Sequence, residues 1–166
     1  LSIRRQRQMC KETVCGLGGG AKGFNKANPR VGNLQGKFRC IGGIDVNAAA
    51  IRDFERLSGS RGTVLDLFDR DQFKDFHGKE PPREWREATA ADIRHAAGGE
   101  YPHIVFLSAP CKGFSGLLSE NRSKTAKYQT LNRLTLRGVW LMLEAFQDDL
   151  PELFSYTHLR AHETRH

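Results

Sequence analysis

Short apolar stretches alternate along the chain with stretches in which apolar residues recur at helical spacing. The apolar stretches predict short strands at residues 11–17, 38–46, 63–68 and 103–107. The amphipathic stretches predict helices at residues 21–27, 48–57, 90–97 and 131–146. The charged segment 69–87 contains Pro81-Pro82 and is predicted to be a surface excursion. Because strands alternate with helices, we predict an α/β fold with a doubly wound, mostly parallel sheet.

The composition fits one domain with a packed core, at 166 residues, 39% hydrophobic and 27% charged. No apolar run reaches the roughly 20 residues that span a bilayer, so we expect no membrane partner. The formal net charge of +7 favours a polyanionic partner. Residues 1–10 hold Arg4, Arg5 and Arg7 and are expected to form a disordered or non-native N-terminus.

The cysteines and the N-terminal residues together predict a cytoplasmic protein with reduced thiols. The four cysteines form no CxxC pair and do not cluster. No apolar segment follows the N-terminal arginines, as one does in a secretory signal.

A glycine-dense turn at residues 16–20 follows the first predicted strand and opens a helix. Glycine lets the backbone approach a ligand closely, and the amides at a helix N-terminus favour an anionic group. Asp45 ends the second predicted strand, where a carboxylate can accept hydrogen bonds from ribose hydroxyls. Asp66 ends the third in a similar way, within reach of an adenine amino group. These residues predict a cofactor that contains a nucleoside.

The turn does not choose between two cofactors. Gly16, Gly18 and Ala21 satisfy the GxGxxG/A pattern of dinucleotide sites, so NAD is a candidate. S-adenosyl-L-methionine is the other candidate, because it binds at the same position of similar sheets.

The loop after the fourth predicted strand reads Ser-Ala-Pro-Cys-Lys-Gly-Phe-Ser-Gly over residues 108–116. Loops at the carboxyl ends of strands carry the chemistry in open α/β sheets. The thiol of Cys111 stands beside Lys112, which favours thiolate character. Cys111 is therefore a candidate nucleophile.

Two motifs of the chain resemble those of the DNA (cytosine-5-)-methyltransferases. Residues 15–19 resemble the glycine turn of that family, and residues 110–115 resemble its Pro-Cys-Gln-X-Phe-Ser loop. Their order and spacing agree from about Val14 to Phe154. The resemblance implies S-adenosyl-L-methionine as cofactor and a truncated, Rossmann-like SAM-dependent methyltransferase fold over residues 11–154. It also implies a bacterial or phage enzyme that acts as a monomer, with double-stranded DNA and its flipped cytosine as the partner.

The resemblance also implies roles for individual residues. Cys111 would attack cytosine C6, so that C5 can take up the methyl group. Cofactor contacts are expected from Val14, Cys15, Gly16, Gly18, Gly19, Asp45, Val46, Asp66, Leu67, Pro110 and Leu131. Nucleic-acid contacts are expected from Lys112, Ser115, Arg122, Lys124 and Lys127. No metal site is expected.

The chain departs from the family at three places. Val14 replaces a phenylalanine of the first motif, and Lys112 replaces a glutamine. The family's Glu-Asn-Val motif is missing, and neither Glu152 nor Glu163 has its context. We interpret residues 155–166 as an adapter-derived tail, and we do not interpret its HExxH spacing as a zinc site. The fragment is therefore expected to be inactive alone.

Three other functions are compatible with the sequence. Methylation of tRNA cytosine would use the same cysteine loop. An NAD-dependent oxidoreductase would use the glycine turn but needs no cysteine after the fourth strand. A non-enzymatic DNA-binding module would show salt-dependent DNA affinity without any effect of S-adenosyl-L-methionine.

Overall fold

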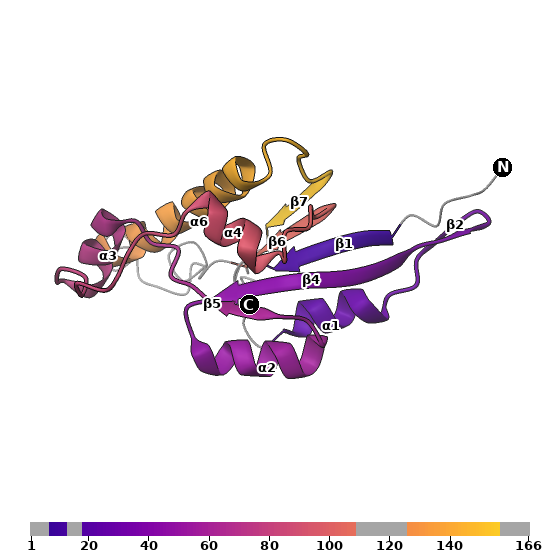
Figure 1. Ribbon diagram of the computed structural model, residues 1–166, viewed down its shortest axis with the longest axis horizontal. Coiled ribbons are helices and arrows are strands. Elements are labelled where there is room, and N and C mark those ends of the chain that lie inside the picture. Colours follow the sequence, from indigo (N-terminus) through magenta and orange to yellow (C-terminus); the bar gives the residue numbers. More distant parts are fainter. Residues whose placement is uncertain (1–6, 13–17, 109–125, 157–166) are drawn as a thin grey trace, which may run out of the picture.

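Five parallel strands form the central sheet of the computed structural model, which describes residues 7–12, 18–108 and 126–156 (Figure 1). Each strand pairs with its neighbour in the parallel direction. The order across the sheet is β5 (Gly62–Val64), β4 (Lys37–Asp45), β1 (Arg7–Glu12), β6 (Ile104–Leu107) and β7 (Leu153–Tyr156). The predicted α/β class with a parallel sheet is confirmed.

Helices lie on both faces of this sheet (Figure 1). On one face α1 (Gly19–Lys26) contacts β1 and β4, and α2 (Ala48–Ser58) contacts β4 and β5. On the other face α4 (Ala90–Ala96) contacts β4 and also α6 (Ala126–Ala145), against which α3 (Arg70–His77) packs. A small antiparallel hairpin of β2 (Arg30–Val31) and β3 (Leu34–Gln35) joins α1 to β4 and projects from one end of the molecule (Figure 1).

Each face of the sheet has its own apolar core. The larger core lies against α4 and α6 and includes Ile44, Ile93, Val105, Met142 and Phe146. The smaller one lies against α1 and α2 and consists of Ala21, Cys40, Ile51 and Phe54. Residues 40–45 of β4 are all buried, as expected for a strand covered on both faces.

Two adjacent glycines in β4 allow both helical layers to approach the sheet. A Cβ on Gly43 would lie 2.5 Å from Cζ of Phe54 in α2. A Cβ on Gly42, which points to the opposite face, would overlap the carbonyl oxygen of Ala96 in α4. Successive side chains of a strand point to opposite faces, so this pair of glycines leaves space for one neighbour on each side.

The first predicted strand begins earlier than its sequence pattern indicates. Residues 7–10, expected to be disordered or non-native, belong to β1 and pair with β4. Cys10 pairs with Cys40 on one side and with Ile104 on the other. Residues 7–10 are therefore ordered by backbone pairing with β4, which the disordered alternative did not anticipate, and their being non-native stays a prediction.

The charged segment 69–87, predicted as a surface excursion, contains the helix α3. Asp69 accepts a hydrogen bond from the Gln72 amide at 2.7 Å, and the Gln72 side chain accepts one from the Asp69 amide at 3.1 Å. This reciprocal pair is a capping box. Phe73 is buried in a cluster with Phe68 and Leu131. The capping residues and the apolar positions of one face can be read from the sequence. The charged residues between them masked the helical pattern, so the helix was not predicted.

Two strand ends also differ from the expected bounds. β5 stops at Val64, so Leu65 to Phe68 leave the predicted strand 63–68 and form a loop. β7 continues to Tyr156, which pairs with Leu107, while Ser155 pairs with Phe106. The first two residues of the predicted tail 155–166 are thus part of the sheet.

The double glycine of β4 generates a prediction about stability. Gly42→Ala should lower the free energy of unfolding by about 2–3 kcal/mol, because the new Cβ overlaps backbone that belongs to α4. Gly23→Ala is the matched control, since a Cβ there meets nothing within 4 Å. It should raise stability by about 0.5–1 kcal/mol, because Ala is the better helix former. Urea unfolding of both variants tests this, and equal effects would contradict it.

Candidate functional site

The carboxyl edge of the sheet gathers the predicted cofactor residues that the structure describes. Strands β1, β4, β5 and β6 all end at this edge because they run parallel. Gly18 precedes α1, Asp45 is the last residue of β4, and Asp66 lies two residues after β5. After β1 the chain forms β4 and β5 on one side of it, and then β6 and β7 on the other side. Such a reversal is where ligands bind in open α/β sheets.

Gly18 begins α1 with a backbone that favours glycine. Its φ is +78°, in the left-handed region. A Cβ there would also lie 2.9 Å from the Cα of Phe54, so the turn contacts α2 directly. Among the described residues, no side chain caps the first turn of α1. The amides of that turn, which begins at the exposed Gly19, are thus suited to an anionic group.

Asp45 is held by the residues that follow it. Its exposed fraction is 8%, and its Oδ1 accepts a hydrogen bond from the Asn47 amide at 2.8 Å. Asn47 in turn caps α2 by accepting from the Ala49 amide at 2.9 Å. The Asp45 carbonyl accepts from the Leu65 amide at 3.0 Å, which joins the ends of β4 and β5. The neighbouring Val46 is exposed.

Asp66 has a defined orientation for a different reason. Its Oδ1 accepts from the Phe68 amide at 3.0 Å, and its Oδ2 accepts from Nε1 of Trp85 at 3.2 Å. Trp85 packs on Phe73 of α3, with ring centroids 5.0 Å apart. The 69–87 segment therefore supplies one of the two hydrogen bonds that orient the Asp66 carboxylate.

Arg137 of α6 binds the loop that carries Asp66. Its Nε donates to the carbonyl of the buried Leu67 at 2.8 Å, and its guanidinium contacts Glu87 at 3.1 Å. One side chain thus joins the loop that carries Asp66 to the end of the 69–87 segment. Sequence reasoning missed both Trp85 and Arg137, because their partners lie 19 and 70 residues away. The signals were the indole of Trp85 in the charged segment 69–87 and the guanidinium of Arg137 in a mostly apolar helix.

Leu131 lies in the apolar cluster beneath this loop. It is buried with Phe68 and Phe73, and so packs α6 against the residues that follow Asp66. Its predicted cofactor contact stays a prediction.

Several predicted site residues lie outside the described part of the chain. They are Val14, Cys15, Gly16, Pro110, Cys111, Lys112, Ser115, Arg122 and Lys124. Lys127 belongs to α6.

Glu152 lies just before β7, at the edge opposite Asp45. His103 lies just before β6, and its Nδ1 donates to the Glu152 carboxylate at 2.8 Å. This hydrogen bond holds the pKa of the Glu152 carboxyl below its ordinary value. Glu152 therefore forms a hydrogen bond with His103 at the amino edge, away from the edge that carries the candidate cofactor residues.

The described residues contain neither a metal-binding cluster nor a membrane-spanning helix. No group of three or more His, Cys, Asp or Glu side chains there could hold a metal ion. No helix in the same part of the chain is long and apolar enough to cross a membrane.

Comparison with known proteins gives matches to solved structures. Neither a protein-family model nor a curated protein matches the chain. Seven chains of solved structures do, among them the crystal structure of the S. pombe Dnmt2 methyltransferase. That match has a TM-score of 0.44 and 16% identity, and it covers 92% of this chain and 35% of the other. The present chain thus spans about a third of the length of that methyltransferase.

The bond between Trp85 and Asp66 can be measured by a double-mutant cycle. Trp85→Phe keeps the ring against Phe73 but removes the N–H donor, and Asp66→Ala removes the acceptor. We expect a coupling of about 1.5–3 kcal/mol in the free energy of unfolding, as is usual for a hydrogen bond to a charged group. Trp140→Phe on the exposed face of α6 is the control and should show no coupling to Asp66. A coupling near zero for Trp85 would contradict the contact.

Proposed function

We propose that the chain is the N-terminal part of the catalytic domain of an S-adenosyl-L-methionine-dependent DNA cytosine-5 methyltransferase, on a doubly wound, Rossmann-like sheet. The observation that carries the proposal is the pair of carboxylates at the ends of adjacent strands. Asp45 ends β4, Asp66 follows β5, and Gly18 opens the helix after β1. These three positions surround the point at which a nucleoside binds in this class of sheet.

The residues present fit the proposed cofactor. Asp45 would accept hydrogen bonds from the ribose hydroxyls, and Asp66 would accept from the adenine amino group. A carboxylate oxygen has two lone pairs, so an oxygen of Asp66 that accepts from Trp85 can accept a second hydrogen bond. The uncapped first turn of α1 would take the carboxylate of the cofactor. The cofactor itself would supply an electrophilic methyl group.

Cys111, on the loop after β6 and outside the described residues, would be the nucleophile. Its thiolate would form a bond to cytosine C6 and break the 5,6 double bond, which makes C5 nucleophilic toward the methyl group. Loss of the C5 proton to a base and breakage of the Cys111–C6 bond would then restore the aromatic ring. Lys112 would favour the thiolate through its positive charge.

The cytosine must leave the base stack to reach this site. Chemistry on a base requires that the nucleotide be flipped into the pocket. Lys112, Ser115, Arg122, Lys124 and Lys127 follow the nucleophile in the chain and are the proposed phosphate contacts at this edge.

The cofactor is tested by binding rather than by turnover. Isothermal titration of the chain with S-adenosyl-L-methionine should detect binding, and Asp45→Ala should weaken it at least about tenfold, because the buried carboxylate is the ribose acceptor. Asp148→Ala, which removes an exposed carboxylate beyond α6, should leave affinity unchanged. Binding of NADH in place of S-adenosyl-L-methionine would overturn the proposal in favour of an oxidoreductase.

The nucleophile is tested in the complete protein that contains this chain. Duplex DNA with 5-fluorocytosine should form a covalent adduct, because the fluorine cannot leave C5 as a proton does. The adduct should be absent with Cys111→Ser and with ordinary cytosine in the same duplex. Denaturing electrophoresis detects it. Failure of the wild-type protein to form an adduct on DNA while it does so on tRNA would reassign the substrate, and failure on both would contradict the mechanism.

A further inference from the structure

Charge is divided unequally between two consecutive stretches of the fold. Residues 18–62, which form α1, the β2–β3 hairpin, β4 and α2, contain eight Lys and Arg against three Asp and Glu, a net charge of +5. Residues 63–108, which include α3 and α4, contain six against nine, a net charge of −3. The helices of these two stretches cover opposite faces of the sheet (Figure 1), and we call the α1–α2 face the basic side and the α3–α4 face the acidic side. The side chains of Arg39 and Arg61 belong to the first stretch but reach Glu100 and His95 of the second.

The cations of the basic side are largely unneutralised. No described carboxylate forms an ion pair with Lys22, Lys26, Arg30, Lys37, Arg52 or Arg61. On the acidic side, by contrast, Arg70 and Lys74 both pair with Glu80. Cations that form no ion pair create an attractive potential for polyanions.

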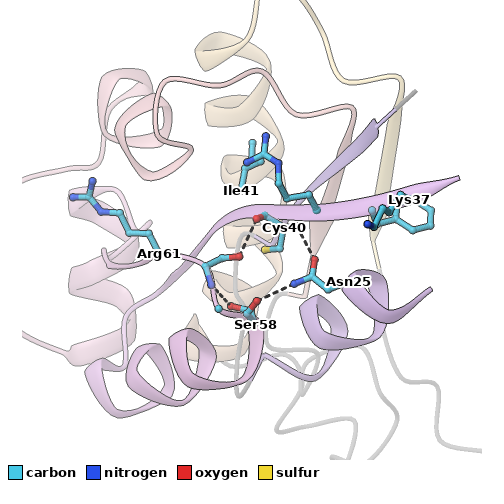
Figure 2. Close-up of a pocket in the computed structure, with 10 residues that line it drawn as sticks. Asn25, Lys37, Cys40, Ile41, Ser58 and Arg61 are labelled. Carbon is cyan, nitrogen blue, oxygen red and sulfur yellow. Dashed lines mark hydrogen bonds between the residues drawn. The ribbon is translucent and has the colours of Figure 1, made fainter. Parts of the chain in front are cut away.

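A groove of about 630 Å³ opens on this side, near the amino ends of β4 and β5. Its lining comes from the end of α1, from β4 and from the connection between α2 and β5. Figure 2 shows Lys37 at one end of the groove and Arg61 at the other, with Asn25, Cys40 and Ser58 between them. None of the lining residues is an Asp or Glu.

The polar groups in the floor of the groove hold one another in place. Asn25 donates to the Ser58 carbonyl at 2.9 Å and accepts from the Cys40 amide at 2.8 Å (Figure 2). Ser60 donates to the Cys40 carbonyl at 2.8 Å. The partial negative charge on the last carbonyl groups of a helix repels an anion. In the groove this group is the Ser58 carbonyl at the end of α2, and it accepts the hydrogen bond from Asn25. These hydrogen bonds hold the polar groups of the floor in place, so the charges of Lys37 and Arg61 dominate the electrostatic potential of the groove.

Arg39 and Arg61 differ in what they can contribute. Arg39 lines the groove but is paired with Glu100, so its charge is compensated. Arg61 contacts Nε2 of His95 at 2.9 Å. No described carboxylate forms an ion pair with Arg61, so its charge is not compensated.

We propose that this groove and the basic side around it bind the sugar–phosphate backbone of a nucleic acid. Lys37 and Arg61 contact phosphates at the two ends of the groove, and the projecting β2–β3 hairpin extends the surface with Arg30 (Figure 1). A concave surface with cations at both ends fits a chain of phosphates, whereas a flat bilayer surface cannot enter it. The contact lies at the amino edge of the sheet, separate from the proposed cofactor edge, and does not depend on the proposed methyl transfer.

The test is fluorescence anisotropy with labelled single-stranded DNA, duplex DNA and RNA over a range of salt concentrations. Lys37→Ala with Arg61→Ala should weaken binding about tenfold and reduce the slope of log affinity against log salt by about 1–2. Lys79→Ala with Arg83→Ala removes the same charge from exposed positions on the acidic side and should change affinity less than about threefold. Lys37→Arg with Arg61→Lys keeps both charges and should retain binding.

Each outcome decides the proposal. Weaker binding by the Lys37→Ala, Arg61→Ala variant than by the Lys79→Ala, Arg83→Ala control supports the proposal. The probe that binds most tightly identifies the nucleic acid. Equal loss in both alanine pairs would reduce the effect to net charge and overturn it, as would binding to vesicles of anionic lipid but to no nucleic acid. The anisotropy measurements contain no S-adenosyl-L-methionine, so a negative result does not change the expected result of the Asp45→Ala titration. The two proposals can therefore fail separately.

Discussion

The absence of two side chains at Gly42 and Gly43 is the constraint on which the rest of the structure depends. A strand in the middle of a parallel sheet must be covered on both faces, and these two positions lie where Ala96 of α4 and Phe54 of α2 come closest. Phe54 in turn lies against Gly18, so the same contact sets the distance between the glycine turn and α2. The close approach of both layers therefore fixes the position of the edge at which Asp45 ends its strand.

The carboxyl edge is held in shape by hydrogen bonds from outside the strands. Asp45 is fixed locally by Asn47, whose side chain also starts α2. Asp66 depends on Trp85 instead, and its loop depends on Arg137 of α6. The charged segment between β5 and α4 thus contributes to the geometry of the candidate site, although it looked like a solvated excursion. The proposed cofactor site and the proposed groove for the sugar–phosphate backbone use opposite edges of one sheet, which leaves both accessible at once.

Much of the fold could be predicted because its signals are local. Helical spacing of apolar residues located α2 and α4 to within a residue or two, and the apolar run 103–107 located β6. Prediction failed where order comes from distant partners. Residues 7–10 begin with the polar pair Arg7-Gln8, yet they belong to β1 because all four pair with β4, and β6 adds a second neighbour from Cys10 onward. α3 was missed because its single buried face is interrupted by charge.

The sequence by itself determined the alternation of elements, the glycine turn and the acidic residues at two strand ends, because each depends on neighbours within a few positions. Only the tertiary structure decided which of these share an edge, since parallel pairing joins strands that lie far apart in the chain. It also decided that Glu152 lies at the edge opposite Asp45, and that the cations around Lys37 and Arg61 gather at one groove. Charge along a chain can be counted, but the side of the sheet that carries it depends on how the helices pack.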